Sequence, residues 1–328
     1  ARGLARDGQE LTFESRVRTI VSHIDVAAER EIAALRSDLN DRDMAQAAVF
    51  SPLGDIFFVA TQGTNTIEVL DTYRGAQVAA IIPNQFEDIE GVGPRLNGLA
   101  PQGLAIDPDG RRLFVHNFLS RSVSVYDVEA LVRGTRKAAR LVREVKAVAS
   151  EKLSARAFAG KRIFYNASDP RMSRDGYLSC ASCHLDGGSD GQVWDFTQVG
   201  EGLRNTIDLV GKAALGHGRV HWSANFDEIQ DFENDIRFQF GGRGFMRDNL
   251  FAQTEDPLGP PKLRKSGDLD NLAIFVASLD RMPESPYRNA DGSLTEAGER
   301  GRAIFTERAC WTCHAGATFT DGLRHDVG

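Results

Sequence analysis

The feature that most constrains this chain is a five-residue pattern, Cys-x-x-Cys-His, which occurs twice. The first copy is CASCH at residues 180–184, and the second is CWTCH at residues 310–314. The chain has four cysteines among its 328 residues, and the two copies contain all of them. Any explanation of the cysteines must therefore also account for the histidine that directly follows each pair.

Three kinds of cysteine chemistry fit this pattern poorly. A structural zinc ion takes four Cys or His ligands, but its ligand pairs usually lie roughly a dozen or two residues apart, whereas these pairs begin at residues 180 and 310. A redox-active pair of the thioredoxin type should follow a strand in a βαβ unit and would hardly occur twice. A disulfide across two intervening residues would close a very small loop, so it would constrain little of the unfolded chain.

A fourth explanation, covalent attachment of haem c, accounts for the cysteines and the histidines together. Two thiols one helical turn apart can each add to a vinyl group of the haem, and the adjacent histidine then reaches the iron as its proximal ligand. The chain has seven histidines, so chance alone would rarely place one after both pairs. We therefore predict two covalently bound haem c groups. The predicted attachment and proximal ligand residues are Cys180, Cys183, His184, Cys310, Cys313 and His314.

Helices are expected around both motifs. The pattern Gly-basic-x-Ile-Phe precedes each of them, at residues 160–164 and 301–305, and a glycine inside a helix, such as Gly301, suggests a close crossing of two helices. Residues 267–287 carry an apolar stripe at helical spacing, with Asp268 as the expected N-cap. A helix before the motif and a helix that closes the domain resemble class I cytochrome c. The two tandem all-α domains expected from the repeat are residues 155–285 and 286–328, the second of them truncated.

Four stretches of the chain occur in the order seen in a known family: GYLSCASCHLDGGSDGQVWDF, LRNTIDLVG, HWSANFDEIQDFENDIR and CWTCHAGATFTDGLRHDVG. Through them, residues 155–328 resemble the di-haem cytochrome c peroxidase and MauG-like family. The resemblance implies one high-spin haem that meets peroxide and a second haem that supplies it with electrons. It places the peroxide or substrate site at the first motif and electron transfer at the second.

The resemblance also implies site residues around the first haem. Trp222 is the best match to a tryptophan that lies between the two haems, and Gln230 is the nearest match to the family's distal glutamine. Glu228 or Glu233 would serve as the acid that acts on peroxide. Residues 223–225 read Ser-Ala-Asn where the family has Asp-Gly-Arg, so peroxidase chemistry rests on an incomplete match.

The sequence leaves the sixth ligand of the first haem iron open. Met246 follows His184 by 62 residues (246 − 184) and precedes the expected closing helix, where class I cytochromes carry a methionine ligand; alternatively, it packs against the haem edge. His217 and His221 are rival ligands or pocket residues, and either could equally be a surface histidine. Asn205 matches a loop in which relatives bind Ca²⁺, which makes it a calcium ligand by resemblance.

The front of the chain repeats a different pattern. Residues 48–71 and 104–127 align at an offset of 56, and each copy predicts a strand, a Pro-x-Gly turn, a second strand, a polar turn and a third strand. Both copies resemble blades of YVTN-type β-propellers, and residues 18–25 resemble the end of a third. The expected segments are an incomplete all-β propeller at residues 1–130 with an insertion at 85–98, and a charged helical connector at 131–154.

Composition and charge narrow the function further. A net charge of −7 without a dense basic tract argues against a nucleic-acid partner. No apolar run approaches the roughly 18 residues of a membrane span. Haem c is attached outside the bacterial cytoplasm, so the motif predicts a periplasmic or cell-surface protein although no signal peptide is visible.

Two functions fit these features. The chain is either a di-haem oxidoreductase of the peroxidase or MauG type, which acts on H₂O₂ or uses it to oxidise a partner protein, or a non-catalytic electron-transfer cytochrome. In the second case both irons would be six-coordinate, and the propeller would dock redox partners. A propeller binding module with purely structural haems is a third and weaker explanation, because two haems in one chain are suited to exchange electrons.

Overall fold

The computed structural model describes residues 19–82, 99–197, 200–323 and 325–326. The chain forms two compact units. The first contains residues 1–154, 162–183 and 236–244, and the second contains residues 155–161, 184–235 and 245–328. Residues 162–183, which the sequence assigns to the first haem domain, therefore cluster with the front of the chain. The insertion expected at residues 85–98 lies outside the described residues.

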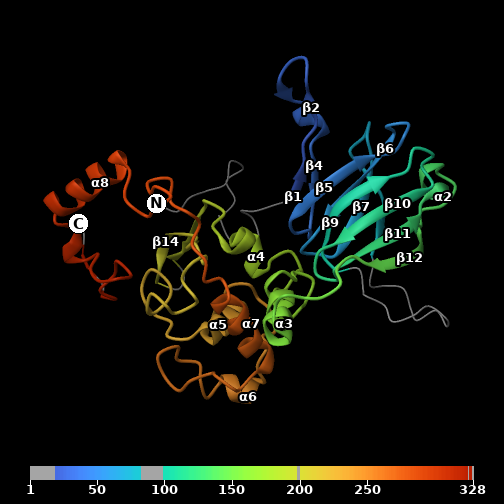
Figure 1. Ribbon diagram of the computed structural model, residues 1–328. Coiled ribbons are helices and arrows are strands. Elements are labelled where there is room, and N and C mark those ends of the chain that lie inside the picture. Colours follow the sequence, from blue (N-terminus) through green and yellow to red (C-terminus); the bar gives the residue numbers. More distant parts are fainter. Residues whose placement is uncertain (1–18, 83–98, 198–199, 324, 327–328) are drawn as a thin grey trace. The chain divides into compact units, whose positions relative to one another are not determined.

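The first unit contains two four-stranded antiparallel sheets (Figure 1). In each sheet, every strand pairs with the next strand along the chain. The first sheet contains β5 (Ala45–Phe50), β6 (Ile56–Thr61), β7 (Thr66–Asp71) and β8 (Gln77–Ile81). The second contains β9 (Pro101–Ile106), β10 (Arg112–Asn117), β11 (Ser122–Asp127) and β12 (Arg140–Lys146). Both blade-like repeats are thus four-stranded meanders.

The sequence repeat is preserved in the structure. The first three strands of the two sheets keep the offset of 56, since they begin at residues 45 and 101, 56 and 112, and 66 and 122. The strand pairing has the same register as well, because Phe58 lies opposite Val69 and Phe114 lies opposite Val125. The predicted order of strands and turns is confirmed.

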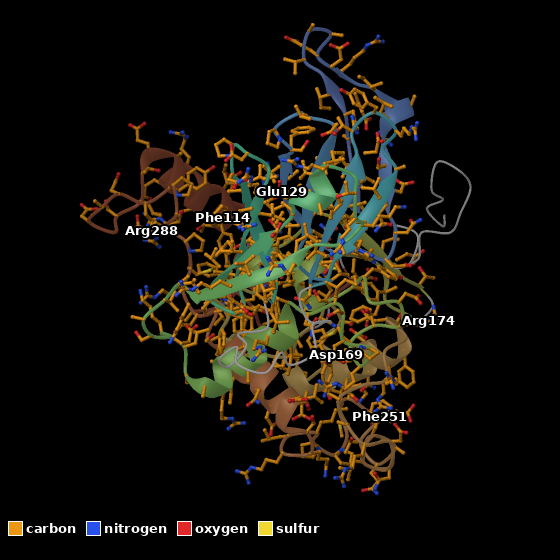
Figure 2. All side chains as sticks on the ribbon, turned by 90° about the vertical axis from the view of Figure 1, so that its right-hand side faces the viewer. Phe114, Glu129, Asp169, Arg174, Phe251 and Arg288 are labelled. Atoms are coloured by element: carbon orange, nitrogen blue, oxygen red, sulfur yellow. The ribbon has the colours of Figure 1, made fainter. Side chains whose placement is uncertain are left out.

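A hydrophobic core lies between the two sheets, where β9 packs against β5 and β6. Phe58 and Val69 enter it from the first sheet, and Leu113 and Tyr126 enter it from the second. Each such buried side chain contributes about 1.5–3 kcal/mol to stability. Phe114, the equivalent of Phe58, lies on the other face of its sheet and is 40% exposed (Figure 2). The face of the first sheet that enters the core is therefore equivalent to the face of the second sheet that points away from it.

A short ladder covers the second face of the first sheet. β1 (Thr19–Val21) pairs with β4 (Ser37–Leu39), and Leu39 packs with Phe57 and Leu70 of the sheet. The remaining short elements here are β2 (Ile24–Asp25), which pairs with β3 (Arg30–Glu31), and the 3-10 turn η1 (Ala33–Leu35). The described part of the segment expected to end a third blade therefore forms two-stranded ladders instead.

The prediction of a helical connector at residues 131–154 is wrong. After one helical turn, α2 (Glu129–Val132), the chain enters β12, the fourth strand of the second sheet. The Leu, Arg, Lys and Glu residues of this segment favour a helix by propensity. However, the edge of β11 offers a row of backbone hydrogen bonds, and Leu141 packs into the core between the sheets. Tertiary packing overrides the local preference.

The remaining regular elements of the described residues are short helices and one hairpin. The first unit contains α4 (Cys180–Cys183), and the second contains η3 (Leu185–Gly187), η5 (Ile229–Asp231), α6 (Asp248–Phe251), α7 (Gly267–Ala277), α8 (Glu296–Glu307) and η6 (Cys310–Thr312). Helices α3 (Ala155–Phe164) and α5 (Phe232–Phe238) contribute residues to both units. A hairpin of β13 (Val193–Phe196) and β14 (Gly202–Asn205) lies within residues 155–285, so the expectation of an all-α domain is wrong for this segment.

The close helix crossing expected at Gly301 is found at the equivalent glycine of the first copy. Gly160 in α3 lies against α7, where an added Cβ would overlap the carbonyl oxygen of Asn271. An added Cβ at Gly301 would meet nothing within 4 Å among the described atoms. The apolar stripe predicted for residues 267–287 is confirmed within α7, whose buried apolar residues are Leu269, Leu272, Phe275 and Val276, but the helix already ends at Ala277.

The N-cap of α7 differs from the expected one. The hydroxyl of Ser266 accepts a hydrogen bond from the backbone N–H of Leu269 and caps the helix. Asp268 lies in the first turn, where its negative charge interacts favourably with the positive end of the helix dipole. The N-cap is therefore the hydroxyl of Ser266 and not the predicted carboxylate of Asp268.

Candidate haem sites

The first motif forms a single helical turn. Helix α4 spans Cys180 to Cys183, so the two thiols lie one turn apart, as attachment to two vinyl groups requires. The backbone N–H of Ser179 donates to Oγ of Ser182 at 2.8 Å, which closes the N-terminal turn. Both cysteines are partly buried.

His184 follows directly after this turn, and the backbone holds its ring. Nδ1 lies 3.3 Å from the carbonyl oxygen of Gly188. This contact favours a proton on Nδ1 and so leaves Nε2 as the ring atom for a metal. Burial lowers the pKa of His184, although the carbonyl groups of Gly188 and Ile207 oppose that shift. The neutral imidazole that results is the form that ligates iron.

The second motif repeats this geometry with different neighbours. Cys310 begins the 3-10 turn η6, and the backbone N–H of His314 donates to its carbonyl oxygen at 2.9 Å. Nδ1 of His314 lies 3.0 Å from the carbonyl oxygen of Phe319. In both motifs, therefore, the same ring atom of the histidine contacts a backbone carbonyl four or five residues further along.

The residues around the second motif present apolar surface to solvent. Ile304, Trp311 and Phe319 are 56%, 54% and 62% exposed, and the described residues of α8 include no buried side chain. Apolar surface left in water is unfavourable, and a porphyrin ring attached at Cys310 and Cys313 would cover such surface. The thiols, the imidazole and the apolar surroundings together fit a covalently bound haem.

Trp222, the residue expected between the haems, lies on the surface of its unit. It is 61% exposed, and its indole Nε1 donates to the backbone carbonyl oxygen of Asn205 at 2.8 Å. That carbonyl belongs to the residue expected to ligate calcium. The structure therefore brings these two predicted residues together, and their functional roles stay predictions. Among the described residues, no group of three or more His, Cys, Asp or Glu side chains could hold a metal ion.

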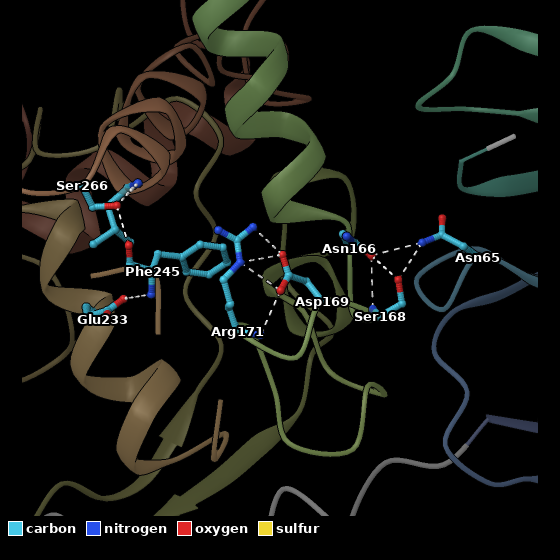
Figure 3. Close-up of polar contacts among 9 residues, drawn as sticks. Asn65, Asn166, Ser168, Asp169, Arg171, Glu233, Phe245 and Ser266 are labelled. Carbon is cyan, nitrogen blue, oxygen red and sulfur yellow. Dashed lines mark hydrogen bonds and ion pairs between the residues drawn. The ribbon is translucent and has the colours of Figure 1, made fainter. Parts of the chain in front are cut away.

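Two of the expected peroxide-site side chains hold the fold of their unit together. Gln230 is buried and donates from Nε2 to Oδ1 of Asp270 at 2.9 Å. Glu233 is buried and accepts the backbone N–H groups of Phe245, at 2.8 Å, and Met246, at 3.0 Å (Figure 3 shows the first). Both side chains thus link the segment around α5 to the chain that follows it.

Glu228, the third of these side chains, is partly buried and lies beside a buried ion pair. Its carboxylate accepts the backbone N–H groups of Lys262 and Leu263, and burial raises its pKa. Nζ of Lys262 donates to Oδ1 of Asp231 at 2.8 Å, and the two side chains are 0% and 1% exposed. Sequence reasoning missed this ion pair, because PPKLRK at residues 260–265 has the composition of an exposed basic turn.

Among the candidate sixth ligands, His221 has both ring nitrogens engaged. Nδ1 lies 3.0 Å from Oδ1 of Asn225, and Nε2 lies 3.3 Å from Oδ2 of Asp235. Burial alone would lower the pKa of His221, but the hydrogen bond and charge of Asp235 outweigh it, so the pKa is raised. Iron ligation would require the ring to give up one of these contacts. Met246 is buried and His217 is partly buried, and ligation by either stays a prediction.

Three curated relatives illustrate what the chain is similar to. Hydrazine synthase subunit gamma of Kuenenia stuttgartiensis is 33% identical over 175 residues, which cover 50% of this chain and 46% of that protein. The methylamine utilization protein MauG of Methylorubrum extorquens is 28% identical over 207 residues, or 52% of each chain. Cytochrome c551 peroxidase of Pseudomonas aeruginosa is 24% identical over 184 residues, or 48% of this chain and 49% of that one. The chain spans about half the length of the curated relatives it matches.

No protein-family model matches the chain. Among solved structures, hydrazine synthase of Kuenenia stuttgartiensis aligns with a TM-score of 0.32 and 17% sequence identity, over 43% of this chain and 48% of that chain. In the part of the chain that the structure describes, no helix is long and apolar enough to cross a membrane.

Proposed function

We propose, from the relationship of this chain to the di-haem cytochrome c peroxidase and MauG-like family, that it is a di-haem c-type redox protein. One observation carries the proposal: each of the two Cys-x-x-Cys-His motifs turns Nδ1 of its histidine toward a backbone carbonyl. Such a contact commonly orients a histidine whose other nitrogen binds a metal. When bound, haem c supplies one-electron transfer and, at an iron with an open sixth position, reaction with peroxide.

The two motifs would have different roles. The first would provide the peroxide or substrate site, because the buried residues of the second unit that match the family's pocket follow it in sequence. The second would serve electron transfer. The residues that would hold the two haems are Cys180, Cys183 and His184 for the first, and Cys310, Cys313 and His314 for the second.

Among the side chains proposed to act on peroxide, Glu228 is the better proton donor. Burial raises its pKa, so it keeps a proton closer to neutral pH than an ordinary glutamate does. Glu233 instead uses both carboxylate oxygens to hold backbone N–H groups. Gln230 would orient the substrate, and the exposed indole of Trp222 would carry electrons between the haems.

A non-catalytic electron-transfer cytochrome is the second candidate function. The hydrogen bonds that engage Gln230 and Glu233 favour it, because side chains that hold the fold together are less able to rearrange around a substrate. In this case Met246 or His217 would fill the sixth position of the first iron, and the blades would dock a redox partner protein.

Location and architecture follow from the same proposal. Covalent haem attachment supports a periplasmic or cell-surface location in a bacterium. The helices around each motif would contribute to two class I cytochrome c-like domains, which follow β-propeller-like repeats in the sequence. A calcium ion at Asn205 would complete the cofactors.

The test uses the purified holoprotein. We expect mass spectrometry to show two covalently bound haems per chain. Each of the matched variants His184→Gly and His314→Gly should remove the proximal ligand of one haem. A high-spin ferric signal with peroxide turnover that His184→Gly abolishes supports the enzyme. Two low-spin haems without turnover support the electron carrier, and a chain that binds fewer than two haems overturns the proposal.

A further inference from the structure

The turns at one end of the blades hold the segment that leads into the first haem motif. The backbone N–H of Ala167 donates to the carbonyl oxygen of Gly63, in the turn between β6 and β7, at 2.8 Å. Nδ2 of Asn65, in the same turn, donates to Oδ1 of Asn166 at 3.1 Å and to Oγ of Ser168 at 2.8 Å (Figure 3). The chain between α3 and α4 is therefore attached to the first blade by hydrogen bonds.

A second contact comes from the turn between β10 and β11. The ring of Phe118 meets that of Tyr165 edge to face, with centroids 5.3 Å apart, and Tyr165 is buried. Aromatic pairs of this kind stabilise beyond the area that they bury. Turns from both blades thus fix the start of the segment that ends at the haem motif.

Asp43 provides the contact that reaches the motif itself. This residue lies between β4 and β5, and it is 5% exposed. Its Oδ2 accepts a hydrogen bond from Oγ of Ser179 at 3.3 Å, and Ser182 also bonds to the carboxyl group. Ser179 directly precedes Cys180, and Ser182 lies between the two attachment cysteines. One buried carboxyl group from the segment that leads into the first blade therefore contacts both serines of the haem-attachment turn.

The surroundings of Asp43 hold it in this position. Its backbone N–H donates to Oγ1 of Thr64 at 3.4 Å, and its carbonyl oxygen accepts the N–H of Gly63 at 3.1 Å. A Cβ added at Gly63 would overlap the Asp43 carboxyl group, so a larger residue there would displace that group. The β6–β7 turn thus leaves room for the carboxyl group and orients its backbone.

We propose that Asp43 is a positioning residue for the first haem, because its carboxyl group ties the attachment turn α4 to the first blade. This inference rests on the proposed function to the extent that it places a haem at Cys180 and Cys183. It goes beyond that function because it gives the blades a part in the haem site. A side chain that is distant in sequence and anchored to the first blade would fix the orientation of the thioether bonds.

The same carboxyl group would make the first haem sensitive to pH. Burial raises the pKa of Asp43 to about 7, against the hydrogen bonds from Ser182 and Ser179 and the backbone N–H of Met44. These groups face the carboxyl group, and the neighbouring Arg42 is paired with Glu68. An ionised carboxylate near a haem stabilises the ferric over the ferrous state. The reduction potential of the first haem should therefore fall as pH rises through neutrality.

The experiment compares Asp43→Asn, Asp43→Ala and a control, Asp41→Asn, which makes the same change at an exposed position two residues away. Redox titrations of the holoprotein from about pH 5.5 to about pH 8.5 follow each haem separately. We expect the potential of the first haem to fall with pH in the parent chain and in Asp41→Asn. We expect this dependence to disappear in Asp43→Asn, while the second haem is unchanged.

Hydrogen exchange at the amides of residues 179–183 gives a readout that does not depend on redox chemistry. Asn retains an acceptor oxygen for the serine hydroxyls, so Asp43→Asn should keep the protection of this turn, and Asp43→Ala should lose it. If Asp43→Ala leaves the exchange and the first potential unchanged, the positioning role is overturned. If the parent chain carries no haem at Cys180 and Cys183, the proposed function fails, and the exchange result still decides whether Asp43 holds the turn.

Discussion

The two haem motifs have the same local geometry in different surroundings. In both, the cysteines lie in one turn and Nδ1 of the histidine contacts a backbone carbonyl. The first turn bonds to the buried carboxyl group of Asp43, whereas the second follows a helix, α8, without a buried residue among those described. Short-range backbone contacts therefore build the motif, and distant segments of the chain build its environment. This difference predicts where substitutions should matter.

The largest expected effect tests the buried charges that follow the first motif. Lys262→Met leaves Asp231 buried without its partner, which should lower the free energy of unfolding by about 3–5 kcal/mol. Arg300→Met, which removes the exposed partner of Glu296 in α8, should change it by less than about 0.5 kcal/mol. Urea denaturation of both variants measures the difference. Equal effects would contradict the contrast between the two regions.

The next effect concerns pH. Because the pKa of Asp43 is raised in the folded state to about 7, its contribution to stability is present below its unfolded pKa and is lost as pH rises toward 7. Asp43→Asn removes the titrating group and with it this loss of stability. The free energy of unfolding of the variant, relative to the parent chain, should therefore increase with pH, by on the order of 4 kcal/mol at pH 8. Denaturation curves at a series of pH values measure it.

Asp321, near the second motif, is a control whose effect on stability should change with pH in the opposite direction. Hydrogen bonds from the backbone of Leu323 and from His325 lower the pKa of its carboxyl group, although it is exposed to solvent. Its contribution is therefore present at neutral pH and is lost as pH falls. If Asp43→Asn and Asp321→Asn change stability with the same pH slope, the assignment of Asp43 is wrong.

A third comparison uses the equivalent glycines before the two motifs. Gly160→Ala forces a methyl group against the backbone of Asn271 and should destabilise the chain by about 1–3 kcal/mol. Gly301→Ala meets open space in α8 and should stabilise by up to about 1 kcal/mol, because alanine favours a helix more than glycine does. Thermal unfolding of the two variants should shift in opposite directions, and a shared direction would argue against the close crossing at Gly160.

The smallest effect comes from the histidines. The pKa of His221 is raised by Asp235 despite burial, so its stabilising contribution is present below its unfolded pKa and is lost as pH rises through its folded pKa. His221→Gln should therefore cost about 1 kcal/mol at pH 6 and less at pH 9. His325→Gln, which removes an exposed pair with Asp321, should cost less at both values. A His221→Gln cost that rises with pH would contradict the raised pKa.

Much of the front of the chain could be predicted from the sequence. The repeat at an offset of 56 predicted the first three strands of each sheet and the turns between them, because alternating apolar residues and the Pro-x-Gly turn are local signals. It did not predict β12, since this segment has helix-favouring residues and becomes a strand on the edge of β11. The same limit applies to Lys262, whose local sequence suggests exposure and whose burial depends on Asp231, 31 residues earlier.

By itself, the sequence determined the two cysteine-and-histidine motifs, the helix before each and the repeated pattern of three strands. These features depend on residue types at spacings of a few positions, so the local sequence specifies them without help from distant segments. The tertiary structure alone decided that Asp43 bonds to the first haem turn, that Gly160 and not Gly301 permits a close helix crossing, and that Glu233 holds backbone amides. Each of these depends on burial and on partners distant in sequence, and no local pattern encodes either.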